Sequence, residues 1–510
     1  MGDIVPFQEE FRQVLPEVIG NKDYKIFREI LGRITEIIRL SKIDNKVMIE
    51  AIRLSQEEYN LSRKVEGKEP KQLTWKDKIR IQKRSMRVLR CGIARHLTGD
   101  AYRAFSCRLA DSALLQNFCL IDRLCQIKVP SKSQLQRDES LFEEGFLRQI
   151  ISEIIQQTAH EQKSQEDNQV MGLKKAVSLE QYFLDTTCLK ANIHIPVDWV
   201  LLRDATRTLM KAVQLIRAEG LLNRMQDPET FIRQMNRLSI QMTNTRRQKN
   251  GKRGRKKVLR LMKKLVAKVA RHAVIHRDLL FNQQEETIFT ENQALQITGR
   301  IDRVLEQLPQ AVYQAHERII GERKVLNRFK ILSLYEKDVH VIVRGKAGAE
   351  TEFGNTLLLG EQVDGIILDW ELYRDKAAAD NRLLKQSLER INTYHHCKPG
   401  SVTTDRGFDS PANRRYLADA DIENNICPKS VPALREKMKE ASFREKQKRR
   451  SQTEARIGIL KNEFLGNPLR SKGFISRQMS VAWAVLAHNL WVIARLPQAS
   501  AKQSRRPKAA

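Results

Sequence analysis

Three acidic residues in this sequence stand where carboxylates could be held together for chemistry. Asp185 follows the apolar run at 182–184, and Asp405 follows the β-branched run at 401–404. Both runs predict short strands, so each aspartate is expected to close a strand. Glu454 lies in a predicted helix that is otherwise basic. Strand ends can hold two carboxylates rigidly, and a helix packed over the sheet edge can supply the third.

Converging carboxylates of this kind would bind two divalent cations about 3.5–4 Å apart. Hard oxygen ligands favour magnesium or manganese over zinc. Such a pair activates an attacking water or hydroxyl group and stabilises the leaving oxygen of a phosphodiester. A plainer interpretation also fits, because an aspartate after a strand is often a turn former and a helical glutamate beside arginines is often a surface ion pair. Spacing alone leaves both interpretations open.

The charge of the chain indicates a polyanionic partner. Of the 510 residues, 91 are lysine or arginine and 61 are aspartate or glutamate, which leaves a net charge of +30. A charge of that size repels itself unless a partner neutralises it, so nucleic acid is the first candidate and a membrane surface the second. The basic residues are spread through the chain instead of lying on one amphipathic helix, which disfavours the membrane surface.

Other sequence patterns exclude several classes of protein. No apolar run reaches the roughly 18 residues needed to cross a bilayer. The N-terminus lacks the basic start and apolar stretch of a signal peptide. Seven cysteines form neither an even disulfide set nor a C-x-x-C pair. We therefore expect a cytoplasmic protein rather than a secreted, membrane or zinc-finger protein.

The elements that would position the carboxylates divide the chain into regions. Residues 1–156 have helical periodicity, with a basic face at 75–95. Several short helices joined by tight turns suggest a helix-turn-helix-like DNA-binding region there. A polar stretch at 157–180 predicts a linker, and helical periodicity returns at 200–325.

Strand-forming patterns flank this second helical stretch, at 181–199 and within 326–500. The dipeptide at 364–365, Asp-Gly, predicts a hairpin turn. Inside the helical stretch, basic residues surround two glycines at 245–257, which predicts either a solvated loop or a phosphate contact. The basic tail at 501–510 is expected to be disordered. The candidates for a phosphate contact in the basic run are Arg253, Arg255 and Lys256.

Three segments resemble the catalytic motifs of bacterial insertion-sequence transposases of the DDE class. Residues 184–194, Leu-Asp-Thr-Thr-Cys-Leu-Lys-Ala-Asn-Ile-His, are similar to the strand of the first aspartate and the turn after it. Residues 404–410, Thr-Asp-Arg-Gly-Phe-Asp-Ser, resemble that family's D-[RK]-G-[FY]-D-S segment. Residues 450–461 keep the R-x3-E-x6-K part of its Y-x2-R-x3-E-x6-K signature, but Gln447 stands in the tyrosine position.

The resemblance implies an α/β ribonuclease H-like catalytic core, a mixed five-stranded sheet with flanking helices. Asp185 would close the first strand, Asp405 would close the fourth, and Glu454 would lie on a late helix. The helices at 200–325 would then be a large insertion in this core. The all-α DNA-binding region would precede it.

The activity that the resemblance implies is DNA transposition. The protein would bind the terminal repeats of its insertion sequence, hydrolyse phosphodiester bonds at the ends and join the 3′-hydroxyl to double-stranded target DNA. Asp185, Asp405 and Glu454 would be catalytic and would hold two Mg²⁺ (or Mn²⁺) ions, with Asp198 and Asp204 as weaker alternatives for the first aspartate. By analogy we expect a homodimer on DNA, associated with the nucleoid in the bacterial cytoplasm. Besides the basic run, the residues expected to contact DNA are Arg450, Lys461 and Arg406.

Two other functions remain open. A catalytically inactive, transposase-derived DNA-binding protein would keep the charge and the helices but would not need three carboxylates. A ribonuclease H-like nuclease would cut DNA without joining ends. The helical N-terminal region and the long basic insertion favour an enzyme that selects particular DNA ends.

Overall fold

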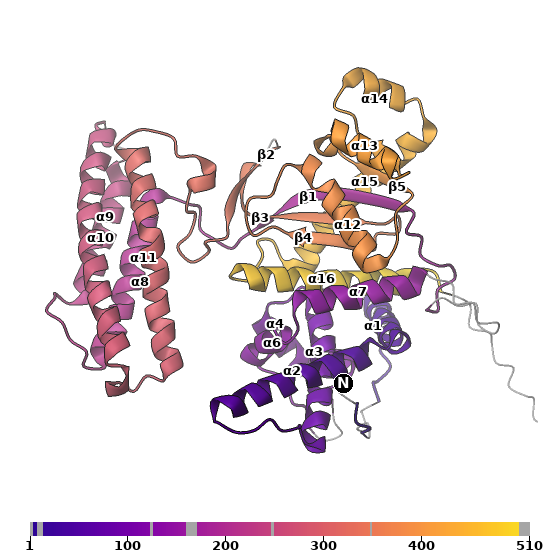
Figure 1. The fold of residues 1–510 in the computed structure, drawn as a ribbon, viewed down its shortest axis with the longest axis horizontal. Helices are drawn as coiled ribbons and strands as arrows, with labels where there is room; N and C mark the ends of the chain where they lie inside the picture. Colours follow the sequence, from indigo (N-terminus) through magenta and orange to yellow (C-terminus); the bar gives the residue numbers. More distant parts are fainter. Residues whose placement is uncertain are drawn as a thin grey trace, which may run out of the picture.

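The chain forms three groups of elements: N-terminal helices, a bundle of long helices, and a mixed sheet with helices around it (Figure 1). The computed structural model describes residues 4–7, 14–122, 126–159, 171–245, 249–346 and 349–498. The predicted tail at 501–510 and parts of the predicted linker and of the basic run lie outside the described residues.

The N-terminal helices pack around the last helix, α16 (Phe474–Arg495), which contacts α1, α3 and α7. Thr74 begins α3 because its hydroxyl accepts a hydrogen bond from the Asp77 backbone N–H, and Gly99, with a φ of +63°, ends it. One continuous apolar core runs from these helices into the sheet. The N-terminal helices are α1 (Lys22–Ser41), α2 (Ile43–Val65), α3 (Trp75–Thr98), α4 (Tyr102–Asp111), α5 (Ala113–Phe118), α6 (Lys132–Glu139) and α7 (Glu144–Ala159).

Six strands of the described residues form one mixed sheet, so the prediction of five strands is wrong. Five of them follow the order β4-β3-β1-β5-β6, with β1, β5 and β6 parallel and β3 antiparallel to its neighbours. The additional strand is β2, because β3 is long enough to pair with β2 at one end and with β4 at the other. The strands are β1 (Gln181–Lys190), β2 (His340–Lys346), β3 (Ala349–Glu361), β4 (Ile367–Leu372), β5 (Ser401–Thr404) and β6 (Glu423–Ile426).

The two predicted aspartates differ in their position along their strands. Asp405 directly follows β5, as expected. Asp185 lies inside β1, so the prediction that it closes the strand is wrong. The parallel pairing of β1 with β5 ends at Leu184, but β1 continues along β3 as far as Lys190. Asp185 therefore marks the end of the parallel pairing rather than the end of the strand.

Helices cover both faces of the sheet. Side chains alternate along a strand, so Tyr182 and Phe183 point to opposite faces. The Tyr182 hydroxyl shares a hydrogen bond of 2.6 Å with Ser387 on α12, whereas the Arg449 guanidinium of α15 lies 4.6 Å from the centre of the Phe183 ring. Asp185, two residues beyond Phe183, therefore faces α15. The helices between β4 and α16 are α12 (Leu384–His395), α13 (Pro411–Asp419), α14 (Val431–Lys437) and α15 (Ala441–Ile459), and α15 continues into a π-helical turn (Leu460–Leu465).

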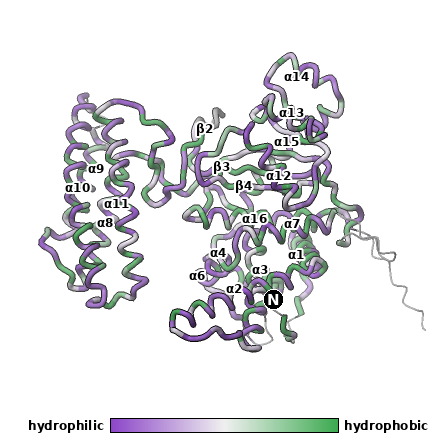
Figure 2. Tube along the Cα trace, in the orientation of Figure 1, coloured by the Kyte–Doolittle hydropathy of each residue, from purple (hydrophilic) through white to green (hydrophobic). Residues whose placement is uncertain are grey.

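Four helices between β1 and β2 form a bundle beside the sheet, at the left of Figure 1. Their buried side chains make a core of their own. Figure 2 shows hydrophobic and hydrophilic residues alternating along them, as expected for helices with one buried face. The bundle consists of α8 (Asp198–Ala218), α9 (Pro228–Thr245), α10 (Gly251–Asn282) and α11 (Glu291–Ile319).

The basic run before residue 258 is helical over most of its described part. Helix α10 begins at Gly251, so the prediction of a loop is wrong from that residue onward. Val258, Leu259 and Met262 are buried at helical spacing, and this packing holds the basic turns that precede them in helical form. The first turns of α10 carry Arg253, Arg255 and Lys256.

Among the described residues, the helices are all too short or too polar to cross a membrane.

Candidate active site

Pairing between β1 and β5 brings two of the predicted aspartates together. Leu184 pairs with Thr404 in parallel register. The next residues, Asp185 and Asp405, therefore start side by side on strands that run about 4.8 Å apart. Asp405 Oδ1 accepts a hydrogen bond of 2.8 Å from the backbone N–H of Gly407, which fixes its side chain at the strand end.

The electrostatic environment of Asp185 reflects this neighbour. Burial raises the pKa of Asp185 to about 6, and the negative charge of Asp405 contributes to the rise. Glu454 acts in the same direction, while the Arg450 guanidinium lowers the pKa. Loss of solvent and a nearby like charge both disfavour the ionised carboxyl group. Negative charge is therefore concentrated at the pair, and a bound cation would relieve it.

Glu454 and Lys461 reach the same place from α15 and the π-helical turn after it. Both line a cavity of about 240 Å³ that also contains Asp185. Lys461 Nζ donates a hydrogen bond of 3.2 Å to the hydroxyl of Thr187, two residues beyond Asp185. The other residues that line the cavity are Thr186, Glu352, Ile457, Gly458, Asn462 and Asn467.

Arg450 holds the Glu454 side chain, which is 55% exposed. Arg450 Nη1 lies 3.3 Å from Glu454 Oε1, and Arg450 Nε donates a hydrogen bond of 3.3 Å to Gln447 Oε1. Gln447 Nε2 in turn donates to the carbonyls of Asn425 at 2.7 Å and Thr404 at 3.3 Å. Gln447, which stands in the tyrosine position of the motif, thus ties α15 to the ends of β5 and β6.

The carboxylates fit a hard divalent cation in their chemistry and only partly in their arrangement. Asp185 and Asp405 offer adjacent oxygen ligands of the kind that magnesium and manganese prefer. Within the part of the chain that the structure describes, however, no three His, Cys, Asp or Glu side chains are arranged to hold a metal ion. Glu454, the third predicted carboxylate, instead forms an ion pair of 3.3 Å with Arg450.

A further carboxylate at this site, Asp380, was not among the predicted residues. It precedes α12, and its Oδ1 accepts a hydrogen bond of 3.1 Å from the Thr186 hydroxyl. A β-carbon on Gly407 would lie 2.8 Å from Asp380 Oδ2 and 3.0 Å from Asp405 Oδ1, so the two carboxylates approach the same glycine. No spacing or motif in the sequence distinguishes Asp380 from the other acidic residues.

Sequence reasoning also missed the residue that anchors α15. Glu361 on β3 is fully buried, and its Oε1 accepts two hydrogen bonds of 3.0 Å from Arg449. The Thr453 hydroxyl donates to the same oxygen at 2.8 Å, and Arg456 Nη1 lies 3.4 Å away. Because Thr453 directly precedes Glu454, this network fixes the part of α15 that carries the third predicted carboxylate. A buried glutamate in a strand is visible as such only once the sheet is known.

The alternative first aspartates lie elsewhere. Asp198 begins α8 and forms an ion pair of 2.7 Å with Arg318. Asp204 lies on α8 and pairs with its neighbour Arg203 at 3.1 Å. Neither lines the cavity that contains Asp185.

The predicted DNA contacts are not all in one place. Arg450 and Lys461 lie at the carboxylates, and Arg406 is exposed in the short turn directly after Asp405. The basic residues of α10 belong to the bundle, where Lys256 pairs with Glu322 at 2.8 Å. The other two predicted DNA contacts on α10 are Arg253 and Arg255.

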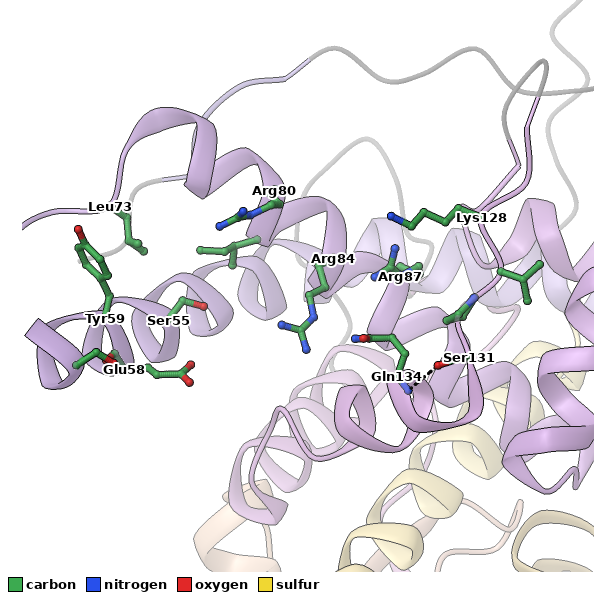
Figure 3. Close-up of a pocket in the computed structure, with 14 residues that line it drawn as sticks. Ser55, Glu58, Tyr59, Leu73, Arg80, Arg84, Arg87, Lys128, Ser131 and Gln134 are labelled. Carbon is green, nitrogen blue, oxygen red and sulfur yellow. Dashed lines mark hydrogen bonds between the residues drawn. The ribbon is translucent and has the colours of Figure 1, made fainter. Parts of the chain in front are cut away.

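Basic side chains also converge on a groove in the N-terminal helices (Figure 3). The groove encloses about 740 Å³ between α2, α3 and the start of α6. Arg80, Arg84 and Arg87 follow one another along α3, and Lys128 lies across from them. Arg84 is held by Asp138 at 2.9 Å, whereas Nε of Arg87 is buried with no hydrogen-bond partner in the described part of the chain. The basic face predicted at 75–95 thus opens onto a groove.

Comparison with known families gives one match. Residues 362–490 match the family described as "Transposase DDE domain". The matched range includes Asp405, Glu454 and Lys461 and leaves Asp185 outside. Comparisons with curated proteins and with solved structures gave no match.

Proposed function

The chain carries a transposase DDE domain, which confirms the resemblance to DDE-class transposases, and we propose that it is an active DNA transposase. It hydrolyses phosphodiester bonds at the ends of its insertion sequence and joins the freed 3′-hydroxyl to double-stranded target DNA. The observation that carries this proposal is the adjacent pair of Asp185 and Asp405, with Glu454 and Lys461 lining the cavity beside it.

The proposed fold of the catalytic core is that of ribonuclease H. Helices lie around a mixed sheet, and five strands follow the order β4-β3-β1-β5-β6. In this order the first aspartate lies on the central strand and the second follows its parallel neighbour. The bundle between β1 and β2 is then an insertion into the core.

Each proposed catalytic residue has a defined task. Asp185, Asp405 and Glu454 would hold two Mg²⁺ or Mn²⁺ ions, and Glu454 would rotate away from Arg450 to do so. Such ions would activate the attacking water or hydroxyl group and stabilise the leaving oxygen. Arg450, once released, and Lys461 bind phosphate oxygens and hold the scissile bond beside the carboxylates.

The positive charge of the chain and the proposed reaction indicate its binding partners. The N-terminal groove binds the terminal DNA through its arginines, and Arg406 and the basic turns of α10 make further backbone contacts. Joining two ends requires both to be present, so the protein acts as a homodimer on DNA. It acts at the nucleoid in the bacterial cytoplasm.

A second candidate function is a catalytically inactive, transposase-derived DNA-binding protein. The observation that favours it is the ion pair of 3.3 Å between Glu454 and Arg450, which engages the third carboxylate. Such a protein would bind terminal DNA without cutting it.

Cleavage of labelled DNA that carries the ends flanking the gene tests the proposal. Wild type is compared with Asp185→Asn, Asp405→Asn and Glu454→Gln in the presence of Mg²⁺ or Mn²⁺. We expect wild type to nick at the ends, and each substitution to abolish nicking while leaving DNA binding intact. Asp204→Asn is the control, because that aspartate pairs with Arg203 in the bundle and does not line the cavity that contains Asp185.

Each other outcome contradicts a defined part of the proposal. Wild type that binds but never nicks would establish the inactive alternative. An active Asp185→Asn variant would remove Asp185 from the catalytic set. Nicking without strand joining would identify a nuclease.

A further inference from the structure

A second basic cavity lies in the bundle, apart from the carboxylates. It encloses about 380 Å³ between α8, α11 and the segment that leads from α11 to β2. Two pairs of cationic side chains line it, Arg207 and Lys211 from α8, and Arg300 and Arg303 from α11. The remaining lining residues are Thr208, Val304, Leu334 and Tyr335, so none of the described residues that line the cavity is acidic.

The positive charge of this cavity is not compensated by nearby carboxylates. All four cationic residues are exposed, and none has a carboxylate within 4 Å among the residues that the structure describes. Two acidic residues of the same helices are engaged by other arginines, Asp204 by Arg203 at 3.1 Å and Asp302 by Arg277 at 2.8 Å. Four like charges around one cavity repel each other, so an anion shared among them would be strongly favoured.

The cavity is also fixed in position relative to the catalytic core. Leu334 is buried in the bundle core, and the Tyr335 hydroxyl shares a hydrogen bond of 2.8 Å with the hydroxyl of Thr208 on α8. The next residue, Glu336, is buried among core elements, where it pairs with Arg477 on α16 and accepts a hydrogen bond of 3.0 Å from the Gly473 N–H. Three consecutive residues therefore join the wall of the cavity to the helix that packs under the sheet.

We propose that this cavity binds the phosphate backbone of duplex DNA while the carboxylates act on another part of the same DNA. The proposal rests on the proposed function, which makes DNA the substrate. Guanidinium groups match phosphate oxygens in geometry and charge. Contacts of these cationic side chains with phosphate oxygens fix the position of the DNA without reading its sequence.

The test compares two variants with the same loss of charge. The cavity variant combines Arg207→Gln, Lys211→Gln, Arg300→Gln and Arg303→Gln. The control variant combines Arg233→Gln, Arg237→Gln, Arg260→Gln and Lys264→Gln, which also removes three arginines and one lysine from exposed positions, on α9 and α10. Thermal melting and circular dichroism of both full-length variants establish that each one folds.

The readout is the dependence of DNA affinity on salt. A protein that releases counterions on binding loses affinity with a logarithmic slope of about 0.9 per phosphate contact. We expect the cavity variant to lower this slope by about 3 to 4, on end-bearing and on scrambled duplexes alike, and the control variant to leave it close to that of wild type. The pair Arg300→Gln and Arg303→Gln alone should lower the slope by about half as much.

Equal slopes for the cavity and control variants would overturn the proposal. A loss confined to end-bearing duplexes would overturn its sequence-independent part. Cleavage of end DNA by wild type is measured in parallel, so the two proposals can fail separately. If wild type cuts and the cavity variant binds like the control, only this inference fails. If wild type never cuts but the cavity variant lowers the slope, the proposed function fails and the DNA-binding cavity stands.

Discussion

Two helices of the proposed catalytic core, α15 and α16, are held in place by opposite means. Of the 22 residues of α16, 16 are buried, among them the large side chains of Trp483 and Leu486. Of the 19 residues of α15, only Phe443, Thr453 and Ile457 are buried. Apolar packing can therefore position α16, but other contacts must position α15.

Polar contacts position α15. Arg449 donates two hydrogen bonds to buried Glu361 and others to the backbone carbonyls that follow it, and Gln447 bonds the ends of β5 and β6. A helix held in this way keeps a polar surface for charged substrates, yet the direction of each contact fixes its register. The comparison teaches that the scaffold of this core is apolar while its proposed catalytic helix is positioned by charge.

Removing an apolar contact from α16 should have the largest effect on stability. Trp483 is fully buried, and a β-carbon on Gly92 of α3 would lie 2.6 Å from its ring, so α3 and α16 pack there without a gap. Trp483→Ala should lower the free energy of unfolding by about 3–5 kcal/mol, measured by urea denaturation. Ile475→Ala, on an exposed position of the same helix, should change it by less than about 0.5 kcal/mol. Similar losses for both variants would show that packing does not position α16.

Asp185, which faces α15 from β1, and His488 on α16 should give opposite dependences of stability on pH. Burial, with a contribution from Asp405, raises the pKa of Asp185 to about 6 from 3.8, so the folded state holds an extra proton in that window. Its contribution to stability therefore falls as pH rises from about 4 to about 6. Burial lowers the pKa of His488 on α16 to about 4 from 6.5, so its contribution is lost as pH falls through that window.

Single variants should separate these contributions, each of about 3 kcal/mol. Melting temperatures of Asp185→Asn and wild type should differ most at pH 7, where the variant is more stable, and converge near pH 4. The His488→Gln variant should instead gain on wild type as pH falls. Parallel curves for all three proteins would contradict the assigned pKa shifts.

Breaking the anchor of α15 should lower both stability and activity. Glu361→Gln removes the charge that Arg449 and Arg456 share, at a cost of about 2 kcal/mol in the free energy of unfolding. Because Thr453 and Glu454 are adjacent, DNA cleavage should fall more than about tenfold, equivalent to about 1.4 kcal/mol in the barrier. Glu445→Gln, an exposed change on α15, is the matched control and should leave both quantities unchanged. An unaltered cleavage rate in Glu361→Gln would show that the anchor does not position Glu454.

The smallest effect is expected at Gln447. Replacing it with alanine removes the hydrogen bonds to Asn425 and Thr404 and should cost about 1 kcal/mol in the free energy of unfolding. Cleavage should become more sensitive to salt, because Arg450 loses the partner that orients it. Urea denaturation and cleavage at two salt concentrations measure these changes, and an unchanged salt dependence would argue against the orienting role.

Local signals in the sequence were sufficient to predict some parts of this fold. The Asp364-Gly365 turn joins β3 to β4, with a positive φ at the glycine, and β5 covers the predicted run at 401–404. The motif around Asp405 lies in the matched DDE domain. Turn chemistry and motif spacing depend on neighbouring residues, which a sequence displays directly.

Other parts depend on residues far apart in the chain. β1 extends past Asp185 because β3 pairs with it, and the role of Glu361 requires α15 to lie across the same sheet. Asp380 reaches the site because the short turn Asp380–Arg382 contacts the turn Arg406–Phe408, which contains Gly407. Such contacts leave no periodic pattern, so the roles of these two carboxylates could not be inferred from spacing.

The separation of β1 from its partners has a consequence for how the chain folds during synthesis. Lys190 pairs with Gly354, 164 residues later in the chain. At about 5–20 residues per second, the ribosome makes β1 about 8–30 seconds before β3 emerges. During that interval the bundle can fold around its own core, while β1 presents unpaired backbone groups on both edges. A message truncated after the bundle would therefore produce fragments that aggregate or occupy chaperones.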